Sequence, residues 1–321
     1  MWITNVHGLR FVSRTRLLFA AAALLGSSPG AVRAGSDDGG ACQRTARYAL
    51  KSCRSEALED FYLAMGNCEN LSERDDRVEC RKEAKAEYRD ALELCGEQHE
   101  ERDDVCDLLG GGLYDPEIVP GNFVRHVTNP YFPLVPGTTM IYEKVTDEGI
   151  ERVEVTVTDE TREILGVTCT VVHDVASLNG EVEEDTFDWF AQDKEGNVWY
   201  FGEDTRELKD GKVVSLDGAW EAGVDHAKPG IIMKAKPGVG DAYRQEFFLG
   251  EAEDMGKVIG LNQSVSVPFG KFSGCVQTKD FSPIEPGHLE HKYYAPGVGL
   301  VLEVSIHGNG RRTELVSVTK K

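Results

Sequence analysis

Residues 42–106 read CQRTARYALKSCRSEALEDFYLAMGNCENLSERDDRVECRKEAKAEYRDALELCGEQHEERDDVC, and they hold six of the eight cysteines of the chain. The residues between successive cysteines number ten, fourteen, eleven, fourteen and ten, so the spacing is a palindrome. Nested pairs across an antiparallel hairpin produce this symmetry. The spacing therefore predicts three disulfides, Cys42–Cys106, Cys53–Cys95 and Cys68–Cys80.

Each arm of the expected hairpin has the periodicity of an α-helix. Steps of eleven and fifteen residues leave the three cysteines of one arm on one side, because a helix turns by about 100° per residue. Most other residues on that side are small, which lets two helices come close enough for disulfides. The small residues are Ala46, Ala49, Ala57 and Ala64 on the first arm, and Ala84 and Ala91 on the second. The same side also carries one aromatic residue on each arm, Phe61 and Tyr88.

The outermost rung is less regular than the other two. Between Cys95 and Cys106 the matching face carries Gln98, His99 and Arg102 in place of small residues. Gly96 is therefore expected to end the second helix and to leave Cys42–Cys106 on a looser tail.

The cysteine pattern resembles the twin-cysteine helical hairpins of coiled-coil-helix-coiled-coil-helix proteins, with a third rung added. The resemblance covers residues 42–106 and implies a structural staple. A metal site is the alternative use of six cysteines. No C-x-x-C pair occurs among them, and an exported protein is expected to oxidise its thiols, so disulfides are favoured.

The beginning of the chain predicts export. Three arginines precede the apolar run Leu17–Leu25, and the small residues Val32 and Ala34 suit cleavage before Gly35. The run is too short to cross a bilayer, which needs about twenty apolar residues. Residues 1–34 are therefore expected to be a signal peptide, with a mature protein in the periplasm or outside the cell and without a transmembrane segment.

The charge of the chain argues against two kinds of partner. Without residues 1–34 the chain has 31 Lys and Arg against 55 Asp and Glu, a net charge of −24. Nucleic acid and anionic lipid surfaces would repel such a protein. The acidity indicates a well solvated surface.

A linker is expected over residues 108–130. Gly110, Gly111 and Gly112 follow one another there, and Asn129-Pro130 marks its end, so a helix cannot continue. The hairpin before it is expected over residues 35–107.

An all-β domain is expected over residues 131–321. Short β-branched runs such as Val153–Thr158 alternate with turn residues such as Asn179-Gly180. No helix of ordinary length is expected in this domain, although Gly250–Leu261 could hold a short one. The predicted fold class is α+β, a disulfide-stapled antiparallel helical hairpin followed by a curved, half-barrel or barrel-like antiparallel domain.

The β domain also repeats itself weakly. Pro136-Gly137, Gly166–Cys169 and Trp189–Asp193 are echoed by Pro237-Gly238, Phe272–Cys275 and Tyr293–Gly297, with offsets of 101, 106 and 104 residues at the Pro, Cys and Ala positions. A nearly constant offset of this size predicts an internal duplication within one sheet, since solenoids repeat at shorter periods.

Three motifs in the β domain resemble a family of uncharacterised exported bacterial proteins. They are NPYFPLVPGTT (129–139), VSVPFGKFSGC (265–275) and YYAPGVGLV (293–301). The β modules of that family are similar to the curved sheets of periplasmic carriers of the LolA and LppX type. The match covers residues 129–305 and implies a carrier-like fold, but a fold does not define an activity.

Aromatic residues on the two echoed hairpins are the candidate ligand-lining residues. They are Trp189, Trp199, Phe201, Tyr293 and Tyr294. Strand alternation places Trp199 and Phe201 on one face and Tyr200 on the other. Either these side chains form the core, or the concave side of a curved sheet lines an apolar cavity.

Cys169 and Cys275 occupy equivalent positions in the two repeats. A disulfide between them is favoured slightly over two buried thiols, provided that they flank the axis relating the halves.

Metal and catalytic motifs are weak. His288-Leu289-Glu290-His291 fits neither zinc-protease spacing, and a strand sends residues three apart to opposite sides. Asp193–Asn197 lacks the glycine and distal glutamate of an EF-hand and is interpreted as a hairpin turn. No nucleophile elbow, phosphate loop or dinucleotide fingerprint occurs. The sequence therefore predicts no metal, no cofactor and no enzyme.

Two functions remain. The first is a non-enzymatic carrier or binder of an apolar or amphipathic small molecule, such as a lipid, in the periplasm. The second is a structural or protein-interaction module of the cell envelope, with the helical hairpin as the arm that binds a partner protein. A cavity would favour the first function, and an exposed apolar stripe on the hairpin would favour the second.

Overall fold

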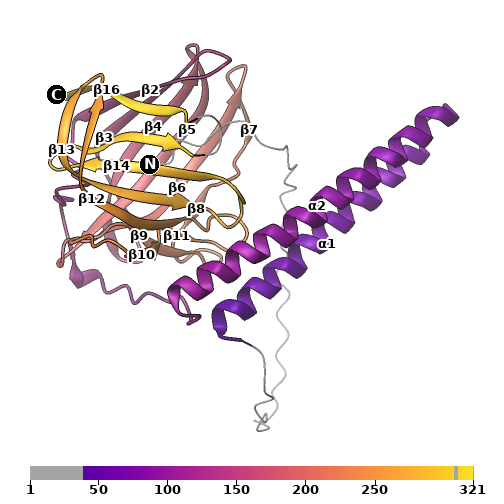
Figure 1. The fold of residues 1–321 in the computed structure, drawn as a ribbon, viewed down its shortest axis with the longest axis horizontal. Helices are drawn as coiled ribbons and strands as arrows, with labels where there is room; N and C mark the ends of the chain where they lie inside the picture. Colours follow the sequence, from indigo (N-terminus) through magenta and orange to yellow (C-terminus); the bar gives the residue numbers. More distant parts are fainter. Residues whose placement is uncertain (1–38, 307–309, 321) are drawn as a thin grey trace, which may run out of the picture.

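A computed structural model describes residues 39–306 and 310–320 of the chain. The expected signal peptide over residues 1–34 lies outside the described residues. A helical hairpin comes first and a nearly closed antiparallel sheet follows, so the α+β fold class is confirmed (Figure 1). Within the described ranges, no helix combines the length and the apolarity needed to cross a membrane.

The hairpin consists of α1 (Ala41–Glu69) and α2 (Arg74–Leu109). All three predicted disulfides are present, with Cα–Cα distances of 5.6 Å for Cys42–Cys106, 5.8 Å for Cys53–Cys95 and 5.6 Å for Cys68–Cys80. In Figure 1 the open end of the hairpin lies beside the barrel and the rest projects away from it.

The expected helix end at Gly96 is wrong, because α2 continues to Leu109. A glycine inside a helix costs only about 1 kcal/mol, and the last turns of α2 make the Cys42–Cys106 disulfide and contacts with the barrel that outweigh this cost. The helix ends instead at Gly110, whose φ of 85° suits glycine and whose N–H donates to Cys106 O.

We expect the middle disulfide to contribute a large part of the stability of the hairpin. Replacing Cys53 and Cys95 together with alanine should lower the free energy of unfolding by about 2–4 kcal/mol, because the unfolded chain gains conformational freedom. The midpoint of urea unfolding, followed by circular dichroism, measures the loss. Non-reducing peptide mapping of the parent protein is the control, and sequential pairs such as Cys42–Cys53 would contradict the nested arrangement.

Twelve strand positions form the barrel-like sheet. The first half contains β2 (Thr138–Val145), β3 (Ile150–Ile164), β4 (Val167–Leu178), β5 (Glu181–Asp193), β6 (Val198–Lys209) and β9 (Lys228–Met233). The second half contains β10 (Ala242–Arg244) with β11 (Glu246–Phe247), β12 (Met255–Val267), β13 (Gly270–Phe281), β14 (Leu289–Ala295), β15 (Gly299–Ser305) and β16 (Arg312–Lys320). Three short strands lie off this path, β1 (Phe123–Val124) on β5, and β7 (Lys212–Ser215) and β8 (Trp220–Glu221) on β6.

The strand pairing confirms the internal duplication. In the first half the pairs run β2–β3–β4–β5–β6–β9, and in the second half β10–β12–β13–β14–β15–β16. β16 then pairs with β2, as β9 pairs with β11. Only Gln245 separates β10 from β11. This one segment therefore pairs with β12 through β10 and with β9 through β11. The sheet thereby nearly closes on itself.

The segment that begins with Asn129 joins the two halves. Asn129 Nδ2 donates to Gly196 O at 2.8 Å, in the turn before β6. Gly297 N, in the equivalent turn before β15, donates to Pro130 O at 2.7 Å. The Phe132 ring lies 5.2 Å from that of Phe190 and 6.5 Å from that of Tyr294, in opposite halves. The NPYFP motif is therefore explained by its structural role.

Two other expectations need correction. The helix expected over Gly250–Leu261 is absent, because β12 occupies the chain from Met255 onward. Cys169 and Cys275 are free and buried. They lie on β4 and β13, which five strands separate along the sheet, and neighbouring strands are about 4.8 Å apart. A disulfide needs Cα atoms within about 7 Å, so equivalence in the repeat placed the two thiols on opposite sides of the barrel.

The expected linker is also more structured than its composition suggests. α2 extends to Leu109, beyond the expected boundary at residue 107. Pro120–Asn122 forms a 3₁₀ turn, β1 pairs with β5, and Val127 is buried in the core of the barrel. Residues 120–130 therefore belong physically to the β domain.

Candidate ligand-binding site

A cavity of about 660 Å³ lies where the open end of the hairpin meets the barrel. Its volume is in the range of small-molecule sites. The walls are mostly apolar and come from the hairpin, the linker and the strands around the Gln245 junction. The lining includes Ala46, Arg102, Cys106, Leu113, Tyr114, Trp199, Ile231, Arg244, Phe247, Phe248 and Glu253, and at its rim Asp225, His226 and Lys228.

Trp199 reaches the cavity because the preceding turn holds it. Asp193 Oδ1 accepts hydrogen bonds from the N–H groups of Gly196 and Asn197, and Asp193 Oδ2 accepts from Trp199 Nε1 at 2.9 Å. The Phe123 ring packs edge-on against the indole with centroids 6.3 Å apart. The prediction that Asp193–Asn197 forms a hairpin turn is confirmed, and the same carboxylate orients the tryptophan.

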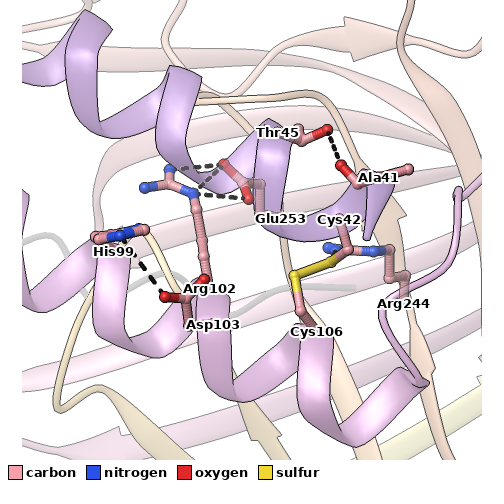
Figure 2. The surroundings of a disulfide bond; sticks show 9 residues. All are labelled: Ala41, Cys42, Thr45, His99, Arg102, Asp103, Cys106, Arg244 and Glu253. Atoms are coloured by element: carbon pink, nitrogen blue, oxygen red, sulfur yellow. Dashed lines mark hydrogen bonds and ion pairs between the residues drawn. A yellow bond between two sulfur atoms is a disulfide. The ribbon is translucent and has the colours of Figure 1, made fainter. Parts of the chain in front are cut away.

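A buried ion pair fixes the hairpin to the barrel at one wall of the cavity. Arg102 Nε lies 3.1 and 3.0 Å from the two oxygens of Glu253, and Arg102 Nη2 lies 2.7 Å from Oε1 (Figure 2). The two side chains are only 6% and 1% exposed. Gln98 Nε2 adds a hydrogen bond of 2.8 Å to Ile284 O. Gln98 and Arg102, the polar residues between Cys95 and Cys106, thus lie on the face of α2 that contacts the barrel.

Arg244 lies near this ion pair, but no carboxylate is hydrogen-bonded to it among the described residues (Figure 2). Its guanidinium lies 4.5 Å from the Phe247 ring centroid and 5.5 Å from that of Tyr114. Nη2 contacts Cys42 Sγ at 3.9 Å, and Nε and Nη1 are buried without a hydrogen-bond partner among the described residues. Burial lowers the pKa of Arg244. An arginine remains protonated even so, so the cavity wall carries a positive charge.

Tyr114 connects the linker to the same wall. Its hydroxyl donates to Pro229 O at 2.8 Å, and its ring packs edge-on against Phe247 with centroids 5.7 Å apart. Burial raises the pKa of Tyr114. The phenol is therefore a neutral donor that places an aromatic face beside Arg244.

The five aromatic residues predicted to line a ligand site are not brought together. Trp199 lines the cavity and the other four do not. Phe201 is fully buried against Phe123, at a centroid distance of 5.6 Å. Trp189 lies under the Arg162 guanidinium at 4.0 Å. Tyr293 Oη accepts a hydrogen bond from Gln277, and Tyr294 is buried against Phe132. A ligand contact of these four residues stays a prediction.

The barrel also buries a cluster of carboxyl groups in its first half. Asp174 on β4 is the pairing partner of Thr186 on β5, which is the pairing partner of Thr205 on β6. The three side chains therefore lie on one face of the sheet. Burial, and then repulsion by Asp188, raises the pKa of Asp174 well above its ordinary value. The same two causes raise the pKa of half-buried Glu203 to about 8. A pKa of about 8 leaves Glu203 mostly protonated at neutral pH, and this reduces the buried charge of the cluster.

In the second half one buried lysine gathers three carboxylates. Lys292 Nζ lies 3.6 Å from Asp280, 3.6 Å from Glu290 and 3.5 Å from Glu303. Burial by itself would lower the pKa of Lys292, but the three carboxylates together raise it well above its ordinary value. The ammonium is thus the charge that holds this cluster together.

The two histidines of the His288–His291 motif lie in different surroundings. His288 precedes β14 and lies 3.5 Å from both Glu285 and Glu290, whereas His291 lies on β14 near Gln277. In the part of the chain that the structure describes, no three His, Cys, Asp or Glu side chains are arranged to hold a metal ion.

Sequence reasoning missed the charged residues of the cavity. Arg102 was visible as a polar residue on an otherwise small-residue face, which was a signal of docking. Arg244 and Glu253 carry no such signal, because they lie in a short strand and a loop whose neighbours come from the distant hairpin.

Comparison with known proteins yields little. No protein-family model matches the sequence, and no curated protein matches it significantly. A solved structure named "putative lipoprotein", from Parabacteroides distasonis ATCC 8503, is 13% identical and aligns with a TM-score of 0.30, covering 60% of this chain and 99% of its own. A likeness this slight does not establish a shared fold or function, and the expected family and LolA-type resemblances are not confirmed.

Proposed function

We propose that the protein is an exported, non-enzymatic binder of an apolar or amphipathic small molecule, which it holds in the cavity between the hairpin and the barrel. The cavity of about 660 Å³ with mostly apolar walls carries this proposal. Its walls come from three parts of the chain that a disulfide and a buried ion pair hold together, so the cavity is preformed. Three disulfides support a location in an oxidising compartment.

Trp199 offers a direct test. We expect Trp199→Leu to weaken binding of N-phenyl-naphthylamine, an uncharged fluorophore that brightens in apolar cavities, by about tenfold, because burial of a large aromatic surface is worth 1–2 kcal/mol or more. Trp189→Leu is the matched control, since Trp189 is also an indole on a neighbouring strand but does not line the cavity. Fluorescence titration measures both variants, and circular dichroism checks that they remain folded.

Two results would contradict the proposal. One is equal binding by the two tryptophan variants, which would place the fluorophore elsewhere. The other is a parent protein that binds no fluorophore and that carries no small molecule when native mass spectrometry is applied to material purified from its own host.

The second candidate function is a protein-interaction module of the cell envelope. Large side chains stay exposed along α1, with Tyr48 67% and Tyr62 65% exposed and Leu58 and Leu63 beside them. The hairpin that carries them projects away from the barrel (Figure 1). A ligand-free protein that binds no fluorophore would favour this role.

A further inference from the structure

The charges around the cavity do not balance. The lining carries three cations, Arg102, Arg244 and Lys228, and two carboxylates, Glu253 and Asp225. Asp225 is exposed and Lys228 pairs with Asp115 outside the cavity, so Arg102, Arg244 and Glu253 are the charges of the buried wall. Both oxygens of Glu253 accept hydrogen bonds from Arg102, and Gly250 N donates to Oε1 at 2.9 Å. Arg244 therefore has no carboxylate hydrogen-bonded to it among the described residues.

The position of Arg244 makes this imbalance costly. The residue is 7% exposed, so water does not solvate the guanidinium as it would at the surface. Its contacts are the faces of Phe247 and Tyr114 and a long contact to the sulfur of Cys42, which is a weak acceptor. A buried charge without a counter-charge destabilises a protein. An anion in the cavity would remove that cost.

The walls beside Arg244 define the rest of the ligand. Tyr114, Trp199 and Phe247 line the cavity with aromatic surface, and Ile231 and Leu113 add aliphatic surface. A small hydrophilic anion would leave these walls in contact with water, and an uncharged apolar molecule would leave Arg244 without a hydrogen-bonded counter-charge.

We infer that the ligand is an amphipathic anion, whose carboxylate or similar oxygen-bearing head group lies at Arg244 and whose apolar body lies against Tyr114, Trp199 and Phe247. This inference rests on the proposed binding function and names the chemical class of the ligand. Arg244 is the residue that selects the head group, and the aromatic walls select the body.

The test compares three probes that share either the head group or the body. Calorimetric titration of the oxidised protein is expected to show decanoate binding at least about tenfold more tightly than decanol, because a hydrogen bond to a charged group is the stronger one. Acetate, which has the head group alone, should show no measurable binding. Arg244→Met should reduce the affinity for decanoate by about tenfold or more and leave that for decanol unchanged.

Two further variants test whether the positive charge at residue 244 itself, and not the loss of any arginine, causes the change in affinity. Arg244→Lys keeps the positive charge and should keep a preference for decanoate, and Arg206→Met removes an exposed arginine outside the cavity and should change nothing. Without ligand, Arg244→Met should be at least as stable as the parent protein, which shows that a loss of affinity is not a loss of fold.

The outcomes separate this inference from the proposed function. If the parent protein binds decanol as tightly as decanoate, or if Arg244→Met weakens both equally, the anion preference is wrong while the binding function stands. If the parent protein binds neither decanoate, decanol nor N-phenyl-naphthylamine, both proposals fail together.

Discussion

Arg102→Met is expected to lower the free energy of unfolding by about 3–5 kcal/mol, because it leaves the Glu253 carboxylate buried without its guanidinium partner. Both side chains are almost completely buried, and the three N–O distances of 2.7 to 3.1 Å indicate a bidentate pair. The measurement is equilibrium unfolding in urea. Because Arg102 also forms a wall of the cavity, the same variant should weaken binding of the fluorophore.

Two comparisons test this explanation. Arg152→Met removes an exposed ion pair with Glu143 and should cost no more than about 1 kcal/mol. The double variant Arg102→Met, Glu253→Met removes both buried charges and should recover most of the lost stability, since apolar pairs of similar volume often replace buried ion pairs without loss. If Arg102→Met costs as little as Arg152→Met, the ion pair does not hold the hairpin on the barrel.

Lys292→Met is expected to have an equal or larger effect on the barrel. The substitution keeps the aliphatic part of the side chain and removes the ammonium that faces Asp280, Glu290 and Glu303. Three buried carboxylates without a cation would repel one another in a poorly solvated site, so we expect a loss of about 3–5 kcal/mol or more at neutral pH. Thermal or urea unfolding measures this loss.

The pH dependence of the loss identifies its cause. Burial and repulsion already raise the pKa of Glu303 well above its ordinary value, and without Lys292 the pKa of its neighbours should rise as well. A carboxyl group with a raised pKa in the folded state stabilises the fold below its unfolded pKa of about 4 and loses that contribution as pH rises. The variant should therefore approach the parent in stability as pH falls from about 8 toward about 4.

An exposed lysine provides the control for this experiment. Lys271 is exposed on β13, and Lys271→Met should change stability by less than about 0.5 kcal/mol at any of these pH values. A Lys292→Met variant whose loss does not depend on pH would show that packing of the side chain, and not the charge balance of the cluster, stabilises the barrel.

These two predictions concern different uses of buried charge. The Arg102–Glu253 pair joins residues 151 positions apart in the sequence and fixes the orientation of one part of the molecule against the other. The Lys292 cluster lies within the second half of the barrel, where neighbouring strands β13, β14 and β15 supply the carboxylates and the lysine. Only the first pair bears on the shape of the cavity.

The nested disulfides and the duplicated sheet were predictable from the sequence because both depend on regular spacing. Steps of eleven and fifteen residues place the cysteines of each arm on one side of a helix, so they can meet across an antiparallel helix pair, and the covalent geometry of a disulfide leaves little freedom. Motifs repeated at an offset of about one hundred residues implied equivalent strands, and the pairing around the barrel follows that equivalence.

Equivalence in the sequence did not predict proximity. Cys169 and Cys275 are equivalent, yet they lie half of the sheet apart and remain free. The aromatic residues of the echoed hairpins are equivalent as well, and of the five only Trp199 faces the cavity. A repeat tells which strands correspond, whereas the closure of the sheet decides how far apart they lie.

The sequence by itself determined the helical hairpin, its three disulfides and the two related halves of the β domain, because each follows from periodicity along the chain. Tertiary structure alone decided the closure of the sheet at Gln245, the docking of Arg102 on Glu253 and the unpaired position of Arg244. The reason is physical. Arg102 and Arg244 meet partners more than one hundred residues away in the sequence, and burial sets the energies of these contacts only after the hairpin and the barrel have come together. The closure at Gln245 depends on where the curved sheet brings its two ends, which no local pattern in the sequence records.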